Sequence, residues 1–368
     1  MRVDIFCKVV DNYGDIGVCW RLAQQLSNEH QIDIRLWIDE LHTATKIIPQ
    51  LDVSLASQLI NNIKICHWPE PLPESEIPDV VIEAFACELP ESYQKAMQAK
   101  KPLWINLEYL SAERWVDEYH AQSSIHPRLG LKKYFYFPGF SPLSGGLIRE
   151  QALTEQRQSF QTSEQAQADF WKNLAVEQNE KLKVSLFCYP HAPVHSLLDS
   201  MSDSIKPVHL LVPEGIASEA IKAYFAVAQM SVGDIFASNQ LTVQIIPFLS
   251  QSEYDKLLWA CDLNFVRGED SWIRALWSAQ PFIWQPYQQE ENTHFTKLEA
   301  FLDRYASDNL ILQQAHHAWL GTGSTHALWD TICYEIDVLK QHARTQTEYF
   351  ENEPDLAAKL VIFCKNHL

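Results

Sequence analysis

The sequence predicts an α/β fold made of two domains, each built around a mainly parallel β-sheet. In the first 140 residues, short apolar runs alternate with helical patterns, and the same alternation begins again near residue 182. Strands separated by helices indicate parallel sheets with right-handed crossovers. The chain has 368 residues, which is long for a single hydrophobic core, so two domains are expected.

The first predicted domain opens with a buried strand and an amphipathic helix. Residues 3–10 (VDIFCKVV) are nearly continuously apolar, as in a central parallel strand. The next segment has apolar residues at the spacing of one helix face, namely Cys19, Leu22, Ala23 and Leu26. Further strands are predicted at 32–39, 78–86 and 101–110.

A change in composition marks the boundary between the domains. Residues 137–147 are rich in Gly, Pro and Ser, which indicates a long loop, and the segment after them is polar and rich in Gln. We therefore predict a first domain at 1–155, a linker helix at 156–180 and a second domain at 181–349. A final amphipathic helix at about 350–368 is expected to pack back on the first domain.

The second predicted domain repeats the rhythm of strands and helices. Its strands are predicted at 182–190, 206–215, 241–249, 262–266 and 280–286. Ser252 and Asp255 have the spacing of a capping box, which predicts a helix start before the fourth of these strands. The chain after residue 308 is helical in pattern.

Composition and charge argue against several classes of protein. Lys and Arg total 29 against 47 Asp and Glu, and the net charge of −18 repels nucleic-acid backbones. No apolar run is long enough to span a membrane. The eight cysteines have no C-x-x-C spacing and the N-terminus makes a poor signal peptide, so we expect a cytoplasmic protein without a zinc site.

The stretch "NFVRGEDS" has the layout of an anion site, because a strand leads through a short turn into a helix. Gly268 lets a ligand approach the backbone, Ser271 offers a hydroxyl, and Arg267 and Arg274 are nearby cations. Glu269 and Asp270 would repel a diphosphate, but they could accept hydrogen bonds from sugar hydroxyls or hold a cationic acceptor. The alternative is structural: Asp270 caps the helix and Glu269 is a favourable first-turn charge.

Aromatic side chains gather near the ends of the strands in the second half. They are Phe187, Tyr189, Phe248, Tyr254 and Tyr287. Such rings commonly hold a nucleobase by stacking, and Gln251 could contact a base edge. The alternative is ordinary packing at the rim of the core.

The loop "DNYGD" follows the first strand and carries two carboxylates, Asp11 and Asp15. Loops at this place in α/β proteins commonly hold ligands. The alternative is a turn at residues 12–14 with Asp15 as the N-cap of the next helix. The chain has no D-x-D pair, which favours a diphosphate site without a metal ion.

Four stretches together resemble the EarP family of protein-arginine rhamnosyltransferases, which modify bacterial elongation factor P. They are FCKVVDNYGDIGVCWRLAQQL, LFCYP, PFLSQSEYDKLLWACDLNFVRGEDS and QPFIWQPYQQEENTH. The likeness runs through nearly the whole chain. It implies the GT-B glycosyltransferase architecture, in which two Rossmann-like domains face each other across a cleft. It also implies an inverting transfer of rhamnose from dTDP-β-L-rhamnose to an arginine side chain of elongation factor P.

The resemblance further implies roles for individual residues. Asp15 would be the general base, with Asp11 beside it, and Glu269 would be essential for activity. The positions that would bind dTDP-rhamnose are Gly14, Phe187, Tyr189, Phe248, Gln251, Tyr254, Asp270 and Ser271. No cofactor or metal is implied, and elongation factor P would be the protein partner.

Two other functions fit the pattern of the residues. A nucleotide-sugar epimerase can share the two-domain architecture and the diphosphate turn, but it would convert the donor alone. A non-catalytic module could bind a nucleotide sugar through the aromatic cluster, and it would tolerate the loss of Asp15.

Overall fold

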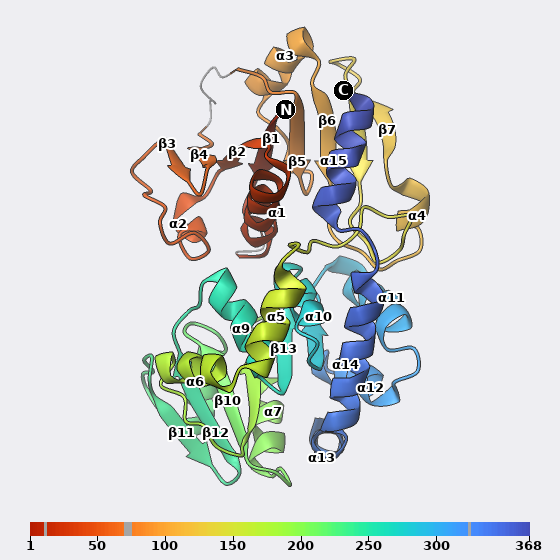
Figure 1. Cartoon of the computed structure of the whole chain (residues 1–368). Helices are drawn as coiled ribbons and strands as arrows, with labels where there is room; N and C mark the ends of the chain where they lie inside the picture. The colour runs from red at the N-terminus through yellow and green to blue at the C-terminus, as the bar shows by residue number, and fades with distance from the viewer. Residues whose placement is uncertain (11–12, 70–75, 323–324) are drawn as a thin grey trace. The chain divides into compact units, whose positions relative to one another are not determined.

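The structure is a computed structural model that describes residues 1–10, 13–69, 76–322 and 325–368 (Figure 1). The chain divides into two compact units. Unit 1 contains Met1–Gln151 and Asn352–Leu368, and unit 2 contains Ala152–Glu351. Each unit is a β-sheet covered by helices.

The sheet of unit 1 has eight strands within the described residues, in the order β3-β4-β2-β1-β5-β6-β8-β7. The strands are β1 (Arg2–Cys7), β2 (Asp33–Ile38), β3 (Ser57–Ile60), β4 (Ile63–His67), β5 (Val80–Ala84), β6 (Leu103–Leu107), β7 (Gln122–Ile125) and β8 (Lys132–Tyr136). The edge strands β3 and β7 are antiparallel to their neighbours, while the six strands between them pair in parallel. The predicted parallel sheet is therefore confirmed at its centre.

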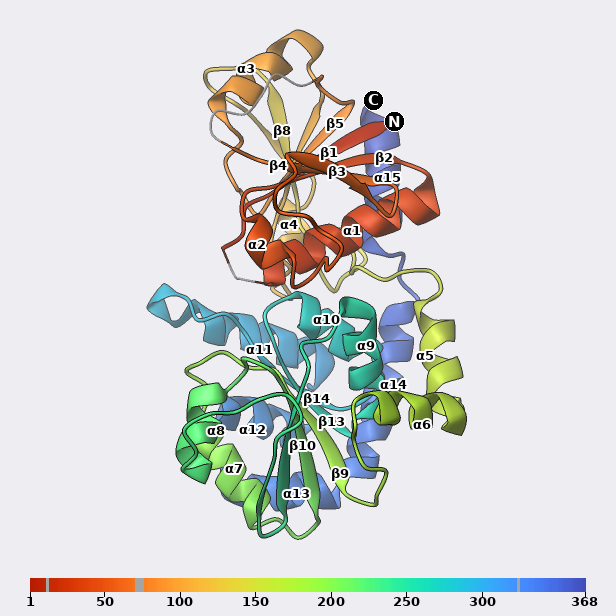
Figure 2. The same cartoon turned by 90° about the vertical axis from the view of Figure 1, so that its left-hand side faces the viewer.

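Helices cover both faces of this sheet (Figure 2). They are α1 (Gly14–His30), α2 (Leu41–Ala44), α3 (Glu91–Lys100), α4 (Val116–Tyr119) and α15 (Leu356–His367). The predicted apolar face of α1 is confirmed, because all four of its residues are at most 1% exposed. On the other side, Tyr93 and Met97 of α3 pack in one cluster with Phe6 and Trp37. Helix α15 contacts α1 within unit 1.

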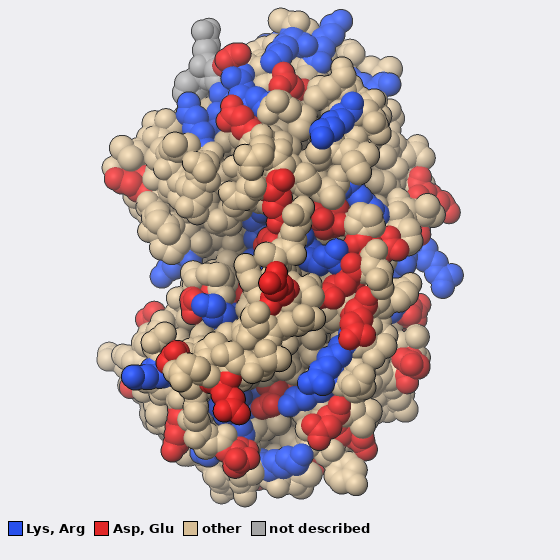
Figure 3. Space-filling view, in the orientation of Figure 1, with Lys and Arg blue, Asp and Glu red and all other residues tan. Residues whose placement is uncertain are grey.

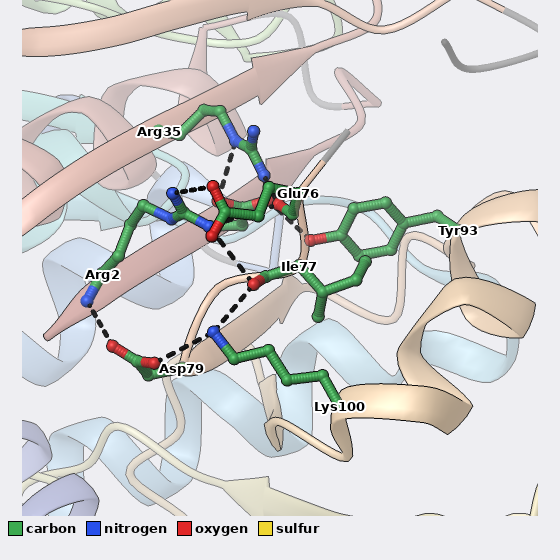
Figure 4. A network of polar contacts seen from close by, with 8 residues as sticks. Arg2, Arg35, Glu76, Ile77, Asp79, Tyr93 and Lys100 are labelled. Carbon is green, nitrogen blue, oxygen red and sulfur yellow. Dashed lines mark hydrogen bonds and ion pairs between the residues drawn. The ribbon is translucent and has the colours of Figure 1, made fainter. Parts of the chain in front are cut away.

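A buried ion pair lies beneath α3. Asp4 of β1 is fully buried, and Arg35 of β2 donates to it from Nε at 2.9 Å. Tyr93 donates to the same carboxylate at 2.6 Å and Trp37 at 3.1 Å. Figure 4 shows the polar network around this pair, which extends to Arg2, Glu76, Ile77, Asp79 and Lys100. The bonds to Asp4 thus tie β1, β2 and α3 together.

The sheet of unit 2 has six strands within the described residues, in the order β11-β12-β10-β9-β13-β14. The strands are β9 (Leu182–Leu186), β10 (Val208–Pro213), β11 (Ile235–Ser238), β12 (Leu241–Ile246), β13 (Leu263–Arg267) and β14 (Phe282–Gln285). The helical elements are α5 (Leu153–Thr162), α6 (Glu164–Asn173), α7 (Val194–Ser202), α8 (Ser218–Phe225), α9 (Gln251–Ala260), α10 (Asp270–Trp277), η1 (Glu290–Asn292), α11 (Thr293–Tyr305), α12 (Leu310–Trp319), α13 (Thr325–Tyr334) and α14 (Ile336–Glu351). Among the described strands of this sheet, only the edge strand β11 is antiparallel.

Two local predictions for unit 2 are wrong. The polar segment after residue 150 forms two helices rather than one, because Ser163 ends α5 and caps α6 by accepting a hydrogen bond from the Ala166 N–H at 3.2 Å. Helix α9 is capped by Ser250, which accepts from the Glu253 N–H at 3.4 Å, and not by Ser252. A serine two residues away offered the same capping chemistry.

We predict that Asp4→Asn lowers the free energy of unfolding by about 3–5 kcal/mol, because it leaves the Arg35 charge buried without its counter-ion. Urea unfolding followed by tryptophan fluorescence measures the change. The control is Glu76→Gln, which removes an exposed carboxylate from the same network and should have no measurable effect. Equal stability of the two variants would contradict a structural role for the buried pair.

We also predict that unit 2 loses stability as the pH falls below about 6.5. Burial lowers the pKa of His209 and of His316 to about 4, so both are neutral in the folded state at pH 6. The unfolded chain binds protons near its ordinary pKa of about 6.5, so acid favours unfolding between these two values. Thermal unfolding from pH 7.5 to 4.5 measures the slope. His316→Gln should reduce it, and an unchanged slope would contradict the prediction.

Candidate functional site

In unit 1 the candidate site lies where β1 ends, at the edge of the sheet that commonly binds ligands in α/β folds. Gly14 is the first residue of α1 and Asp15 is the second. Asp11, the other predicted carboxylate of this loop, lies outside the described residues. The site of unit 1 is therefore built here from Asp15 and its contacts.

The Asp15 side chain is only 2% exposed, and both of its carboxylate oxygens accept hydrogen bonds. Its Oδ2 accepts a hydrogen bond from the Val10 N–H at 2.8 Å, and its Oδ1 accepts one from the Tyr109 hydroxyl at 3.3 Å. Asp15 lies in the first turn of α1, where the helix dipole favours a negative charge. The alternative that Asp15 caps the helix is wrong, because the N-cap residue is Tyr13.

A buried thiol lies close to this loop. The hydrogen bond with Cys19 raises the pKa of Cys7, and burial and the nearby Asp15 raise it further. A thiol with a raised pKa stays protonated at neutral pH and is a poor nucleophile. Asp15 is therefore the better candidate for chemistry at the end of β1.

Unit 1 also contains a cavity away from the predicted site residues. A cavity of about 990 Å³ lies between α3 and the residues around Arg128, with Glu83 and Trp104 in its lining. The carboxylate of Glu83 is already bound by Lys133 and by the Trp104 indole, each at 3.0 Å. Glu83 is thus part of an internal hydrogen-bond network. None of the predicted site residues lines this cavity.

In unit 2 the candidate site surrounds the turn from β13 into α10. Gly268 has a φ of 60°, a left-handed conformation that glycine adopts without strain, and its carbonyl accepts a hydrogen bond from the Trp284 indole at 2.8 Å. The Ser271 hydroxyl accepts from the Arg267 N–H at 3.0 Å and donates to the Arg267 carbonyl. The hydroxyl of Ser271 therefore fixes the shape of the turn.

Two acids stand at the start of α10. Asp270 is its first residue, and Glu269 occupies the N-cap position without a side-chain capping bond. The alternative that Asp270 caps the helix is therefore wrong. Asp270 instead accepts a hydrogen bond from the Gln251 amide at 3.3 Å, which links the first turns of α10 and α9.

The two arginines of the predicted turn have different surroundings. Arg274 points into the interior and donates to Asp255 from two nitrogens, at 2.9 and 2.7 Å. Arg267 is 8% exposed, and its guanidinium lies 4.8 Å from the ring centre of Phe187 and 4.4 Å from that of Tyr189. Among the described residues, no hydrogen bond or ion pair engages the Arg267 guanidinium. Arg274 is thus structural, and Arg267 is the cation available to an anionic ligand.

Aromatic rings line the same edge of the sheet. The ring centre of Phe187 lies 5.6 Å from that of Tyr254 and 6.5 Å from that of Phe248, and all three side chains are half-buried. Burial raises the pKa of the Tyr254 hydroxyl, which stays protonated. On the other side of Arg267, Tyr189 lies 5.6 Å from Tyr287. These rings offer flat apolar surfaces beside a cation, which suits a nucleotide.

The predicted residues thus fall into two groups. Gly14 and Asp15 form the first group, in unit 1. The second group lies in unit 2, where ring contacts and hydrogen bonds involve Phe187, Tyr189, Phe248, Gln251, Tyr254, Asp270 and Ser271. Glu269 lies in the same turn. The sequence reasoning missed Tyr109 and did not choose between Arg267 and Arg274. Tyr109 lies two residues beyond the end of β6, at an edge of the sheet that commonly binds ligands, and this position is the signal that could have found it.

Neither a metal cluster nor a membrane span stands out. Within the described ranges, no group of three or more His, Cys, Asp or Glu residues could hold a metal ion. The same part of the chain has no helix that is long and apolar enough to cross a bilayer. On the face drawn in Figure 3, basic side chains are interspersed with acidic ones and form no continuous patch.

Comparison with known sequences shows one family. Residues 3–365 match the family described as elongation factor P (EF-P) rhamnosyltransferase EarP. The chain is 44% identical to the protein-arginine rhamnosyltransferase of Pseudomonas aeruginosa, and the match covers 98% of both chains. It is 34% identical to that of Neisseria meningitidis, over 99% of this chain and 97% of the relative.

Comparison with solved structures confirms the predicted GT-B fold. A structure described as the basis for EarP-mediated arginine glycosylation of translation elongation factor EF-P matches with a TM-score of 0.71 and 33% identity, over 100% of this chain and 99% of that chain. The spinosyn rhamnosyltransferase SpnG, complexed with thymidine diphosphate, matches with a TM-score of 0.54 at 11% identity, over 99% of this chain and 100% of that one. A UDP-GlcNAc 2-epimerase from Neisseria meningitidis matches at 0.51 and 10%, over the full length of both chains. The last two matches show the fold alone.

Proposed function

This chain belongs to the EarP family, and from that premise we propose that it is an inverting, metal-independent protein-arginine rhamnosyltransferase. The donor is dTDP-β-L-rhamnose, and the acceptor is an arginine side chain of elongation factor P in the cytoplasm. Eight buried free thiols support a reducing compartment. The observation that carries the proposal is the Asp15 carboxylate, which is buried and held on both oxygens at a ligand-binding strand end.

Arginine needs such a carboxylate because its guanidinium is a poor nucleophile. The group stays protonated at any physiological pH, since its pKa is above about 12. An aspartate with an ordinary pKa of about 3.9 cannot remove that proton in advance. The proton becomes acidic only as the new bond forms, and a carboxylate already in place then accepts it.

The proposed reaction is a single displacement at the anomeric carbon of rhamnose. A guanidinium nitrogen forms the new C–N bond while the bond from that carbon to the diphosphate oxygen breaks, and dTDP leaves with the electron pair. The proton of the attacking nitrogen passes to a carboxylate oxygen of Asp15, and the arginine keeps its positive charge. One carboxylate opposite the leaving group gives inversion without a covalent intermediate, as in inverting glycosidases.

The departing dTDP carries a growing negative charge, and the turn of unit 2 is suited to it. The first turn of α10 and its dipole favour an anion. Arg267 adds a full positive charge in a buried setting, where a charge-assisted hydrogen bond is strong. The rings of Phe187, Phe248 and Tyr254 would hold the base. In this proposal a buried arginine and a helix start take the place of a metal ion.

The remaining acids have supporting roles in the proposal. Glu269 stands at the start of α10, where it could accept hydrogen bonds from a rhamnose hydroxyl or hold the acceptor guanidinium. Asp11 would orient Asp15 or the acceptor. Asp270 and Ser271 shape the donor site through their bonds to Gln251 and to the Arg267 backbone.

Intact-mass analysis tests the function directly. Elongation factor P incubated with this protein and dTDP-rhamnose should gain one deoxyhexose on an arginine. An unchanged mass with an acceptor that a known relative modifies would overturn the proposal. An epimerase would alter dTDP-rhamnose without any acceptor, and a binding module would bind it without turnover, so donor analysis by chromatography separates both alternatives.

We predict that Arg267→Gln weakens the binding of dTDP by about 10- to 100-fold, because the diphosphate loses a buried charged partner. Isothermal titration calorimetry measures the change. The affinity of Arg267→Lys for dTDP should lie between those of the wild type and Arg267→Gln. Lysine keeps the positive charge but loses the planar group that stacks on Tyr189. Arg128→Gln, which removes an exposed arginine of unit 1, is the control. Binding of dTDP by Arg267→Gln at wild-type strength would contradict this role.

We predict that Asp15→Asn lowers kcat by at least about 100-fold while dTDP binds as before. Asparagine can still accept the Val10 N–H, so the fold should survive, but its amide cannot take the proton. Asp39→Asn is a matched control, because Asp39 accepts the neighbouring Val9 N–H at 2.9 Å in the same way. If both variants transfer rhamnose at the wild-type rate, Asp15 is structural and not the base.

A further inference from the structure

The segment after β5 has an unusual backbone. Phe85, Ala86 and Glu88 have φ values of 56°, 52° and 55°, in the left-handed region that side-chain-bearing residues rarely adopt. Such strained conformations persist only where the surrounding structure enforces them, and they gather at functional sites. The question is what this turn positions.

The turn is enforced from both sides. The Phe85 N–H donates to the Leu107 carbonyl at 2.7 Å, and the Ala86 N–H donates to the Asn106 side chain at 3.0 Å. The Glu88 N–H donates to the Glu83 carboxylate at 3.1 Å. Asn106 is only 1% exposed, so its bond to this turn is well protected. The strained turn is therefore locked onto the ends of β5 and β6.

The result is a stacked pair of rings beside the candidate base. The ring of Phe85 lies parallel to that of Tyr109, with centres 4.4 Å apart and planes at 12°. Tyr109 follows the end of β6, and its hydroxyl donates to Asp15 Oδ1 at 3.3 Å. Catalytic hydrogen bonds are often this long before the substrate is bound.

We propose that Tyr109 is a positioning residue for Asp15, and that the stacked Phe85 ring holds it in place. The inference rests on the proposed role of Asp15 as the base. Tyr109 fixes one carboxylate oxygen while the Val10 N–H fixes the other. One bond alone would leave the carboxylate free to turn about its terminal torsion, which has a broad energy minimum.

Hydrogen bonds to both oxygens set the plane of the carboxylate. Each oxygen keeps a lone pair that can accept a hydrogen bond from the substrate arginine. The hydroxyl of Tyr109 also stabilises the ionised form, which is the form that a base needs. Other titratable groups near this position are Cys7 and Asp39 at the ends of β1 and β2, and Glu108 beside Tyr109. The Tyr109 hydroxyl itself donates to Asp15 Oδ1.

The test is Tyr109→Phe, which keeps the stack and removes only the hydroxyl. We expect kcat to fall about tenfold, with the KM for dTDP-rhamnose unchanged. The acid limb of the kcat–pH profile should move up by about one pH unit, because the charged carboxylate loses a donor. Phe85→Leu should lower kcat by a smaller factor, since the hydroxyl stays but its ring is less constrained. Tyr119→Phe, an exposed tyrosine of the same unit, is the control.

A readout without turnover separates this inference from the proposed function. Carbon-13 NMR of labelled aspartate carboxyls, with Asp15→Asn for assignment, follows the titration of Asp15 directly. Its midpoint should rise in Tyr109→Phe and stay unchanged in Tyr119→Phe. If wild-type protein modifies no acceptor but this shift occurs, the function is wrong and the positioning contact is real. If Tyr109→Phe matches Tyr119→Phe in both kcat–pH profile and titration, the positioning role is overturned.

Discussion

The ion pair between Asp255 and Arg274 is the interaction on which the candidate site of unit 2 depends. Asp255 belongs to α9 and Arg274 to α10, and two buried hydrogen bonds fix one helix against the other. Helix α9 carries Gln251 and Tyr254, while α10 begins with Asp270. The distance between Tyr254, whose ring could stack on a base, and the start of α10, which could bind a phosphate, is therefore set by this buried pair. A buried pair of this kind costs much to break, because either charge alone would be stranded.

Unit 1 also relies on buried ion pairs, and it has strained backbone conformations near Asp15 as well. Its structural charges are satisfied inside: Asp4 pairs with Arg35, and Glu83 is held by Lys133. At the strand ends, however, the protein tolerates left-handed residues after β5 so that Phe85 can lie against Tyr109. Strain of this sort is a cost that a purely structural turn could avoid with a glycine. Its presence beside Asp15 is easiest to understand as part of the working site.

The sequence was sufficient to predict the central strands and to place most of the candidate residues near strand ends or helix starts, because buried parallel strands and strand-end loops leave strong patterns. It was insufficient wherever two equivalent residues competed. Arg267 and Arg274 flank the same turn, and only the packing of α9 shows that the second is neutralised by Asp255. Ser250 and Ser252 have the same capping side chain, so the sequence alone does not distinguish them, and the structure shows that Ser250 is the N-cap. Short polar strands such as β7, whose four residues are all exposed, leave no hydrophobic pattern to find.

The candidate sites of the two units differ in the sign of the charge that they offer. Unit 1 presents an anion, Asp15, stabilised by hydrogen bonds, whereas unit 2 presents a buried cation, Arg267, stacked between rings. Over the whole chain the net charge is −18, so the general field repels nucleotides and attracts cationic protein surfaces. In the proposed function, a nucleotide sugar would therefore gain its affinity locally, from Arg267 and the start of α10. The proposed acceptor arginine would be favoured both by the negative charge of the whole chain and by the Asp15 carboxylate that would take its proton.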